Sequence, residues 1–209
     1  MSPVDFNLYL ITDRKAVPPG RSLPEVIRGA LEGGVRAVQL REKDLGAREL
    51  YPLALELRRL TREFGARLLI NDRIDVALAV EADGVHLGGQ SLGAAAARRI
   101  LGPGRLIGVS THSLAEAETA QGEGADFLTF GPVYPTPSKA AYGAPVGPGE
   151  LERTCRALRI PVFALGGVKE RHIPEILSAG AAGIALISAL ITSPAPRSTA
   201  ANLLKRLTL

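Results

Sequence analysis

Small residues end two successive apolar segments near the C-terminus and are suited to binding an anion. One segment ends in Gly166-Gly167, and the next, Gly183–Ile187, is followed by Ser188. Glycine has no Cβ, so its backbone N–H can approach an anion closely, and the N-terminus of a following helix adds positive potential. These residues predict a phosphate-binding cup.

A second group of polar residues alternates in the segment Gln39-Leu40-Arg41-Glu42-Lys43. Every second residue of a strand lies on the same face, so Gln39, Arg41 and Lys43 would present their N–H donors together to the oxygens of a ligand. The alternative interpretation is a solvated strand end with local ion pairs.

Asn71-Asp72 and Lys139 are further candidates for ligand contacts. The pair of oxygen-bearing side chains could bind Mg²⁺ or a heterocycle, although Asp72 could equally cap the following helix. Lys139 lies in a long segment rich in Pro, Gly and Ala, where it could close over an anion or remain solvated.

Two histidines have different expected roles. His86 lies inside an apolar segment and is predicted to be a packed, hydrogen-bonded side chain. His112 follows another such segment and is surrounded by hydroxyl residues, where an imidazole could exchange a proton near neutral pH. His112 is therefore the candidate acid/base group.

The elements that must position these residues alternate between apolar, β-branched runs and amphipathic helical patterns, as in parallel βαβ units. The predicted strands are Leu8–Thr12, Ala37–Arg41, Arg67–Asn71, Gly84–Leu87, Leu106–Ser110, Phe127–Val133, Pro161–Gly167 and Gly183–Ser188. The predicted helices are Leu23–Glu32, Ala47–Phe64, Ile74–Val80, Leu92–Leu101, Leu114–Glu123, Pro148–Ala157, Glu170–Ser178 and Ser198–Leu207.

Eight strands and eight helices predict one domain over residues 1–209, a (β/α)₈ TIM barrel whose site lies at the carboxyl ends of the strands. The alternative is an open doubly wound sheet. That fold usually has a glycine-rich fingerprint after its first strand, where this chain has Asp13-Arg14.

The composition excludes several classes of protein. The 25 basic residues are scattered among 21 acidic ones, and the nine aromatic residues form no stacking platform, so nucleic-acid binding is not expected. No apolar run is long enough to span a membrane, no leader is evident, and the single cysteine excludes internal disulfides. We expect a cytoplasmic protein that binds a small anionic molecule.

Eight segments carry a resemblance to a known family. They are, in order, Leu8–Asp13 (LYLITD), Gln39–Lys43 (QLREK), Asn71-Asp72, Gly84–Gly88 (GVHLG), Gly108–His112 (GVSTH), Gly131–Thr136 (GPVYPT), Leu165–Val168 (LGGV) and Ile187-Ser188. In these segments the sequence resembles the thiamine phosphate synthase and TenI family over nearly its whole length. Each motif alone is weak, but eight in the same order are specific.

The resemblance implies either of two activities on one barrel. Thiamine phosphate synthases join hydroxymethylpyrimidine pyrophosphate to thiazole phosphate with Mg²⁺ and release pyrophosphate, whereas TenI-type proteins aromatise a carboxythiazole phosphate tautomer. The residues implied for a synthase are Gln39, Arg41, Lys43, Ser110 and Lys139 for pyrophosphate, Asn71 for the pyrimidine, Asp72 for Mg²⁺, and Thr136, Ser138, Gly166, Gly167, Ile187 and Ser188 for the thiazole phosphate.

One departure from the family pattern bears on this choice. Synthases usually follow His-Leu-Gly with Gln-Glu-Asp, whose Asp is a second Mg²⁺ ligand, whereas Ser91 occupies that position here. A hydroxyl does not supply the charge of a carboxylate, so metal-dependent departure of pyrophosphate should be weakened. We therefore expect a TenI-type thiazole tautomerase, an isomerase that needs no cofactor and uses His112 as its proton carrier.

Two alternatives remain open from the sequence. A thiamine phosphate synthase, which is a transferase, would bind Mg²⁺ through Asp72 and phosphate oxygens. A non-catalytic sensor of a phosphorylated ligand would need neither His112 nor Lys139, and both residues are present. The resemblance also implies a possible homodimer.

Overall fold

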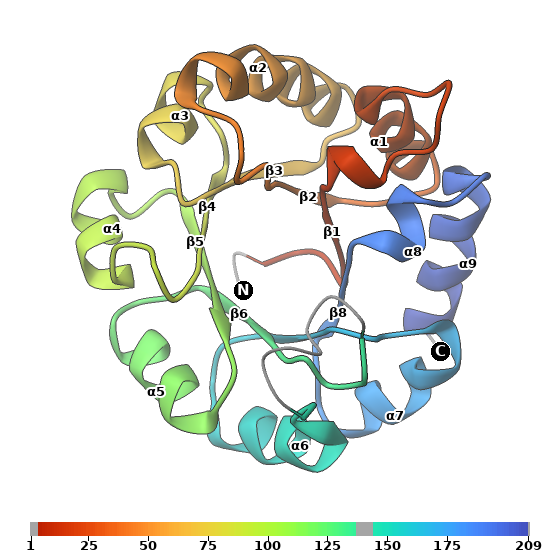
Figure 1. Cartoon of the computed structure of the whole chain (residues 1–209). Helices are drawn as coiled ribbons and strands as arrows, with labels where there is room; N and C mark the ends of the chain where they lie inside the picture. The colour runs from red at the N-terminus through yellow and green to blue at the C-terminus, as the bar shows by residue number, and fades with distance from the viewer. Residues whose placement is uncertain (1–3, 137–143, 209) are drawn as a thin grey trace.

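Eight parallel strands close into a barrel in the computed structural model, which describes residues 4–136 and 144–208. Each strand pairs with the next in the sequence, and β8 pairs with β1, as Figure 1 shows along the barrel axis. The strands are β1 Leu8–Ile11, β2 Ala37–Leu40, β3 Arg67–Asn71, β4 Gly84–Leu87, β5 Leu106–Thr111, β6 Phe127–Phe130, β7 Val162–Leu165 and β8 Gly183–Leu186. The predicted (β/α)₈ barrel is confirmed, and the β1–β8 pairing excludes the open sheet.

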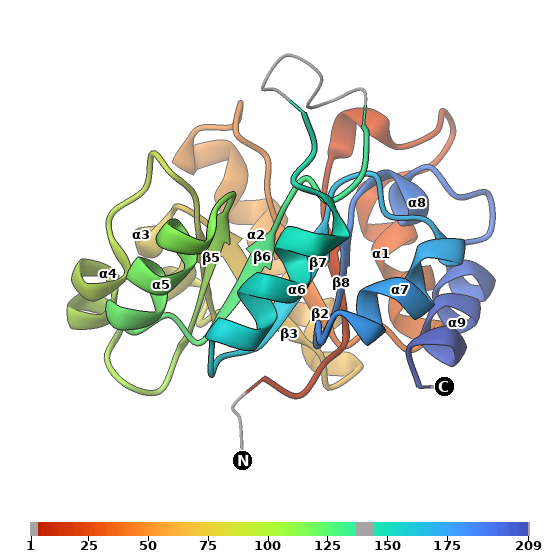
Figure 2. The ribbon, with the colours of Figure 1, turned by 90° about the horizontal axis from the view of Figure 1, so that it is seen from below.

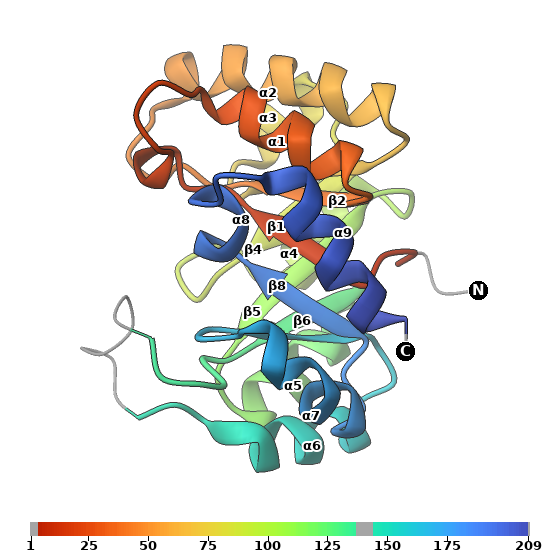
Figure 3. The same cartoon turned by 90° about the vertical axis from the view of Figure 1, so that its right-hand side faces the viewer.

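Helices surround the barrel, and α1, α8 and α9 pack against one another on one side of it (Figure 3). The helices are α1 Leu23–Glu32, α2 Ala47–Glu63, α3 Ile74–Ala79, α4 Ala94–Leu101, α5 Leu114–Gly122, α6 Gly147–Ala157, α7 Ile173–Ser178, α8 Ser188–Ile191 and α9 Pro196–Leu207, with the 3₁₀ helices η1 Arg14–Ala16 and η3 Glu170–His172. In the described part of the chain, no helix combines the length and the apolar character needed to cross a bilayer.

Some elements differ from the prediction at the carboxyl ends of the strands. The last three strands end two or three residues early; after β7 this is because Gly166 and Gly167 have φ angles of 89° and 64°, which a strand cannot contain. Ser188, predicted to end the last strand, instead begins the short helix α8. The predicted helix Glu170–Ser178 is divided into η3 and α7, and η1 was not predicted.

Aromatic rings fill the amino-terminal half of the barrel. The ring of Phe6, just before β1, lies 5.6 Å from that of Tyr9, 5.5 Å from that of Phe127 and 5.2 Å from that of Phe163, between centroids. Figure 2 shows that the N-terminal segment enters the barrel at the end opposite α8. The amino-terminal end is therefore closed by packing, and the carboxyl end is left for the site.

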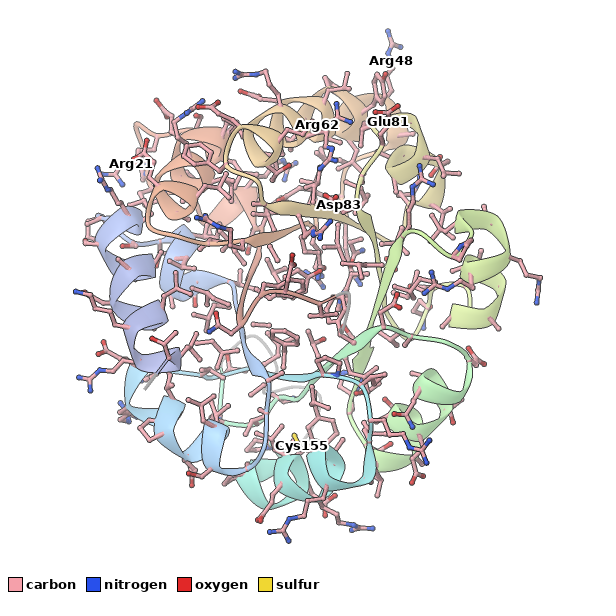
Figure 4. All side chains as sticks on the ribbon, turned by 180° about the vertical axis from the view of Figure 1, so that it is seen from behind. Arg21, Arg48, Arg62, Glu81, Asp83 and Cys155 are labelled. Carbon is pink, nitrogen blue, oxygen red and sulfur yellow. The ribbon has the colours of Figure 1, made fainter. Side chains whose placement is uncertain are left out.

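Two carboxylates join strands and helices at the amino-terminal end of the barrel. Asp83, labelled in Figure 4, accepts hydrogen bonds from the Leu68 backbone N–H at 2.8 Å and from the Arg58 guanidinium at 2.6 Å. Asp126 repeats this arrangement with the Ile107 N–H at 2.7 Å and an arginine of α4. Each carboxylate therefore fixes the start of a neighbouring strand against an outer helix.

The single thiol lies on the inner side of α6, where Figure 4 labels Cys155. The side chain is partly buried, and this burial raises the pKa of the Cys155 thiol to about 11. The thiol is therefore protonated and unreactive at neutral pH.

Candidate active site

The predicted cup residues meet in one cavity of about 410 Å³ at the carboxyl ends of β7 and β8. Of the residues predicted for the thiazole phosphate, the cavity is lined by Thr136, Gly166, Gly167, Ile187 and Ser188. Ser138, predicted for the same end, and Lys139, predicted for the pyrophosphate, lie outside the described residues. The structure thus brings residues from three separate segments to one hollow.

The cup requires glycine at two positions. A Cβ on Gly166 would lie 2.5 Å from the Cβ of Pro132, and a Cβ on Gly167 would lie 2.5 Å from the carbonyl oxygen of Pro135. Both glycines also have positive φ angles, which other residues adopt at a cost. The loop after β6 therefore packs directly on the backbone after β7, and no side chain separates the two.

Asp72 lies at the end of β3 with a positive φ of 59°, an unusual conformation for a residue other than glycine. Its carboxylate accepts hydrogen bonds from the hydroxyl of Ser91 and from the amide of Asn71, the latter at 2.7 Å. Ser91 in turn accepts from the Gly88 N–H at 2.6 Å. A carboxylate and a hydroxyl, both oxygen ligands, therefore lie side by side.

The structure does not use Asp72 as a helix cap. The N-cap position of α3 is Arg73, with no side-chain cap, because the Asp72 carboxylate turns towards the loop after β4. Arg73 donates to both carboxylate oxygens of Asp75, from its Nε and its Nη2. The positive charge of Arg73 is thus engaged by a different carboxylate.

The three alternating donors separate because β2 ends at Leu40. Gln39 lies inside the barrel with 1% of its surface exposed, whereas Arg41 is partly buried and Lys43 is exposed. In the part of the chain that is described, the side chains of Arg41 and Lys43 have no acidic partner within ion-pair distance. Both cations are therefore available to an anionic ligand.

A second cavity, of about 600 Å³, lies between α4 and α5 and the loops that precede these helices, and its lining includes Ser91, Ser110, His112 and Glu116. The His112 ring is about half exposed, and its Nδ1 lies 3.1 Å from a Glu116 carboxylate oxygen. Among the described residues, this cavity and the cup have no lining residue in common. The geometry therefore does not bring His112 to the cup.

The comparisons with known proteins decide the family. The family model described as thiamine monophosphate synthase matches residues 8–190, from β1 to α8. The chain belongs to the thiamine monophosphate synthase family. The family members similar to it include a putative thiamine-phosphate synthase of Geobacter sulfurreducens, 64% identical over 204 residues that cover 98% of this chain and 95% of the relative. A thiamine-phosphate synthase of Moorella thermoacetica is 44% identical over 89% of this chain and 88% of the relative.

A solved structure of the same family has a matching barrel. Thiamine phosphate pyrophosphorylase from Pyrococcus furiosus superposes with a TM-score of 0.88 and 39% identity, covering 97% of this chain and 96% of that one. Membership in this family makes the chain an enzyme of thiamine biosynthesis.

The predicted TenI-type tautomerase is wrong. Relatives at up to 64% identity are named thiamine-phosphate synthases, and the solved relative is a pyrophosphorylase. The error came from treating Ser91 as the loss of a ligand, whereas its hydroxyl lies against Asp72. The proton-carrier role predicted for His112 belonged to the tautomerase reaction and is not part of the function proposed below.

Sequence reasoning assigned no role to Glu42, whose hydrogen bonds connect the turn after β2 to the segment after β1. Glu42 is 6% exposed, and its carboxylate accepts from the Thr12 hydroxyl at 2.7 Å and from the Arg14 N–H at 3.1 Å. Thr12 also accepts from the Arg41 N–H at 2.9 Å. In the sequence, Glu42 is a single acidic residue between Arg41 and Lys43, and this pattern does not show that its side chain is buried.

Sequence reasoning also missed a buried polar network beneath the mouth of the barrel, which is its open end at the carboxyl ends of the strands. Tyr9 is fully buried and its hydroxyl lies 3.4 Å from Nδ1 of His86, whose Nε2 lies 2.9 Å from Oγ of Ser110. Burial lowers the pKa of His86 to about 3. His86 is thus the packed, hydrogen-bonded histidine that was predicted, and it is neutral at physiological pH.

Proposed function

We propose that this protein is a thiamine-phosphate synthase. In this reaction the lone pair of the thiazole nitrogen forms a C–N bond to the pyrimidine methylene carbon. The C–O bond to diphosphate breaks, the diphosphate leaves with the electron pair, and the thiazole becomes a cation. The observation that carries the proposal is 64% identity, over 98% of the chain, to a relative named for this activity.

We assign the thiazole phosphate to the cavity between the ends of β7 and β8. The close packing of Gly166 and Gly167 on the preceding loop leaves their backbone as the wall of the cavity. Ser188 and Thr136 contribute hydroxyl groups to the same cavity. Backbone N–H and hydroxyl donors are suited to the oxygens of a phosphate monoester.

We assign the diphosphate to the opposite side of the mouth. Arg41 and Lys43 bring positive charge without an acidic partner among the described residues, and Ser110 brings a hydroxyl. Lys139 would add a third cation from the loop after β6. Because charge develops on the leaving diphosphate, donors placed there in advance stabilise the transition state more than the substrate.

Asp72 and Ser91 fit Mg²⁺ as a ligand pair. Mg²⁺ is often held by one or two carboxylates together with substrate phosphate oxygens, and in P-loop enzymes a serine or threonine hydroxyl joins an aspartate in this role. In the described residues no three His, Cys, Asp or Glu side chains gather at one point, so a site dependent on the diphosphate is the one that fits. When bound, Mg²⁺ would neutralise charge on the departing diphosphate.

A two-substrate assay tests the proposal. The protein is incubated with Mg²⁺, hydroxymethylpyrimidine pyrophosphate and thiazole phosphate, and both pyrophosphate and thiamine phosphate are measured. We expect equal amounts of the two products, and none when either substrate is omitted. Ligand binding without turnover would contradict the proposal and indicate a sensor.

A further inference from the structure

A line of buried hydrogen bonds crosses the barrel just beneath its mouth and connects four strands. The amide nitrogen of Gln39 on β2 donates to the hydroxyl of Tyr9 on β1 at 3.1 Å. The line continues from Tyr9 to His86 on β4 at 3.4 Å, and from His86 to Ser110 on β5 at 2.9 Å. The first three side chains are at most 2% exposed, so solvent cannot replace these bonds.

The chemistry of Tyr9 sets the direction of this line. Its oxygen accepts from Gln39, and its single hydrogen needs an acceptor, which the described contacts provide only at Nδ1 of His86. If the imidazole hydrogen were on Nδ1, the phenolic hydrogen would be left unpaired in a fully buried place, which is costly. Nδ1 must therefore be the bare nitrogen that accepts from Tyr9, and the imidazole carries its hydrogen on Nε2, 2.9 Å from Oγ of Ser110.

The Nε2 hydrogen in turn fixes the role of Ser110. Its Oγ accepts from Nε2 of His86 at 2.9 Å and from the hydroxyl of Thr129 at 3.2 Å. Both lone pairs are then used, and the serine keeps its own hydrogen. Ser110 is partly exposed, and none of its described contacts offers an acceptor for its own hydrogen, so that hydrogen is available to a group outside the protein network.

We propose that Tyr9 and His86 are positioning residues that hold the Ser110 hydroxyl as a donor to an oxygen of the diphosphate. The inference rests on the proposed function for the identity of the anion, and on the hydrogen-bond geometry for everything else. It also gives Gln39 an indirect role, since its amide nitrogen is committed to Tyr9. These buried side chains thereby act on the leaving group through Ser110.

The orientation of the imidazole is tested first, on the ligand-free protein. Nitrogen-15 NMR distinguishes a protonated ring nitrogen from a bare one, and the His86 signals are assigned as those lost in His86→Asn. We expect the hydrogen on Nε2 in the wild type and a mixture of tautomers in Tyr9→Phe, which removes the hydrogen held by Nδ1. A hydrogen on Nδ1 in the wild type would overturn the inference without affecting the proposed function.

Pyrophosphate binding then tests the link to the ligand. Calorimetry with Mg²⁺ and inorganic pyrophosphate should show binding about tenfold weaker in Ser110→Ala, because a hydrogen bond to a charged group is lost. Tyr9→Phe should weaken binding severalfold in the wild-type background and have no further effect in the Ser110→Ala background. Tyr51→Phe removes an exposed hydroxyl on α2 and should leave binding unchanged.

The same cycle separates positioning from general damage to the barrel. Equal losses from Tyr9→Phe in both backgrounds would mean that Tyr9 acts on packing alone, and would overturn the inference. The inference would also be overturned if the wild type forms thiamine phosphate and the Ser110→Ala variant binds pyrophosphate as tightly as the wild type does. Failure of the wild type both to bind pyrophosphate and to form product would instead contradict the proposed function and remove the ligand assigned to Ser110.

Discussion

The hydroxyl of Ser91 donates a hydrogen bond to the carboxylate of Asp72, across the gap between the loops that follow β4 and β3. The Gly88 N–H donates to the same serine oxygen, so the hydroxyl is held in place by its own loop. A serine in this position therefore keeps an oxygen ligand beside the carboxylate. Under the proposed function, the lower charge of a hydroxyl would weaken the affinity for Mg²⁺ without changing the reaction.

This contact predicts the Mg²⁺ dependence of pyrophosphate release. Ser91→Ala should raise the Mg²⁺ concentration needed for half-maximal rate about tenfold, because a ligand and its support of Asp72 are lost together. Ser91→Asp should lower it, since a second carboxylate adds charge. The measurement is a Mg²⁺ titration at saturating substrates, with the exposed Ser198→Ala on α9 as the control. Identical titrations for all four proteins would show that Ser91 takes no part.

The cup predicts a selective loss of thiazole phosphate binding in Gly167→Ala. The new Cβ would lie 2.5 Å from the Pro135 oxygen and force the loops apart, so KM for thiazole phosphate should rise at least about tenfold. KM for the pyrimidine substrate should change little. Gly65→Ala is a matched control, because Gly65 has a similar φ of 61° and open space around it. A similar effect of both changes on KM would refute the assignment of the cup.

Arg41 should show the opposite selectivity. Arg41→Gln removes a cation without an acidic partner among the described residues, so KM for the pyrimidine diphosphate should rise about tenfold or more, with little change for thiazole phosphate. Steady-state kinetics with each substrate varied in turn measures both values. Arg48→Gln, which removes an arginine that projects from α2 into solvent in Figure 4, should have no effect. Loss of thiazole phosphate binding in Arg41→Gln would place the diphosphate elsewhere.

The buried imidazole of His86 predicts lower stability in acid. Burial lowers its folded-state pKa from 6.5 to about 3, with a smaller opposing effect of Asp72 and a further lowering by Arg41. Between these values the unfolded chain binds a proton that the folded protein does not, so the free energy of unfolding falls as the pH drops below about 6.5. From pH 7.5 to 5.0 this group should account for about 2 kcal/mol.

Urea unfolding across this pH range measures the effect. His86→Asn should reduce the dependence on pH, whatever it does to absolute stability, whereas His112→Asn removes an exposed imidazole and should retain it. An unchanged pH slope in His86→Asn would show that this histidine is not kept neutral by burial.

The barrel could be predicted from the alternation of apolar runs and helical patterns in the sequence. Each βαβ unit is a local pattern, and short connections place consecutive parallel strands next to each other. The sequence also showed two glycines, Gly166 and Gly167, directly after an apolar strand. Both have positive φ angles, which glycine adopts more readily than other residues do. The family followed from eight motifs in order.

Tertiary structure decided what the polar residues contact. Ser91 is 19 positions from Asp72, and Tyr9 is 77 from His86, so no local pattern reveals that their atoms meet. Sequence reasoning therefore counted Ser91 as a missing carboxylate, and it predicted a packed, hydrogen-bonded His86 without its partners Tyr9 and Ser110. Hydrogen bonds across a barrel depend on strand register and on which side chains face inward, and only the closed sheet fixes both.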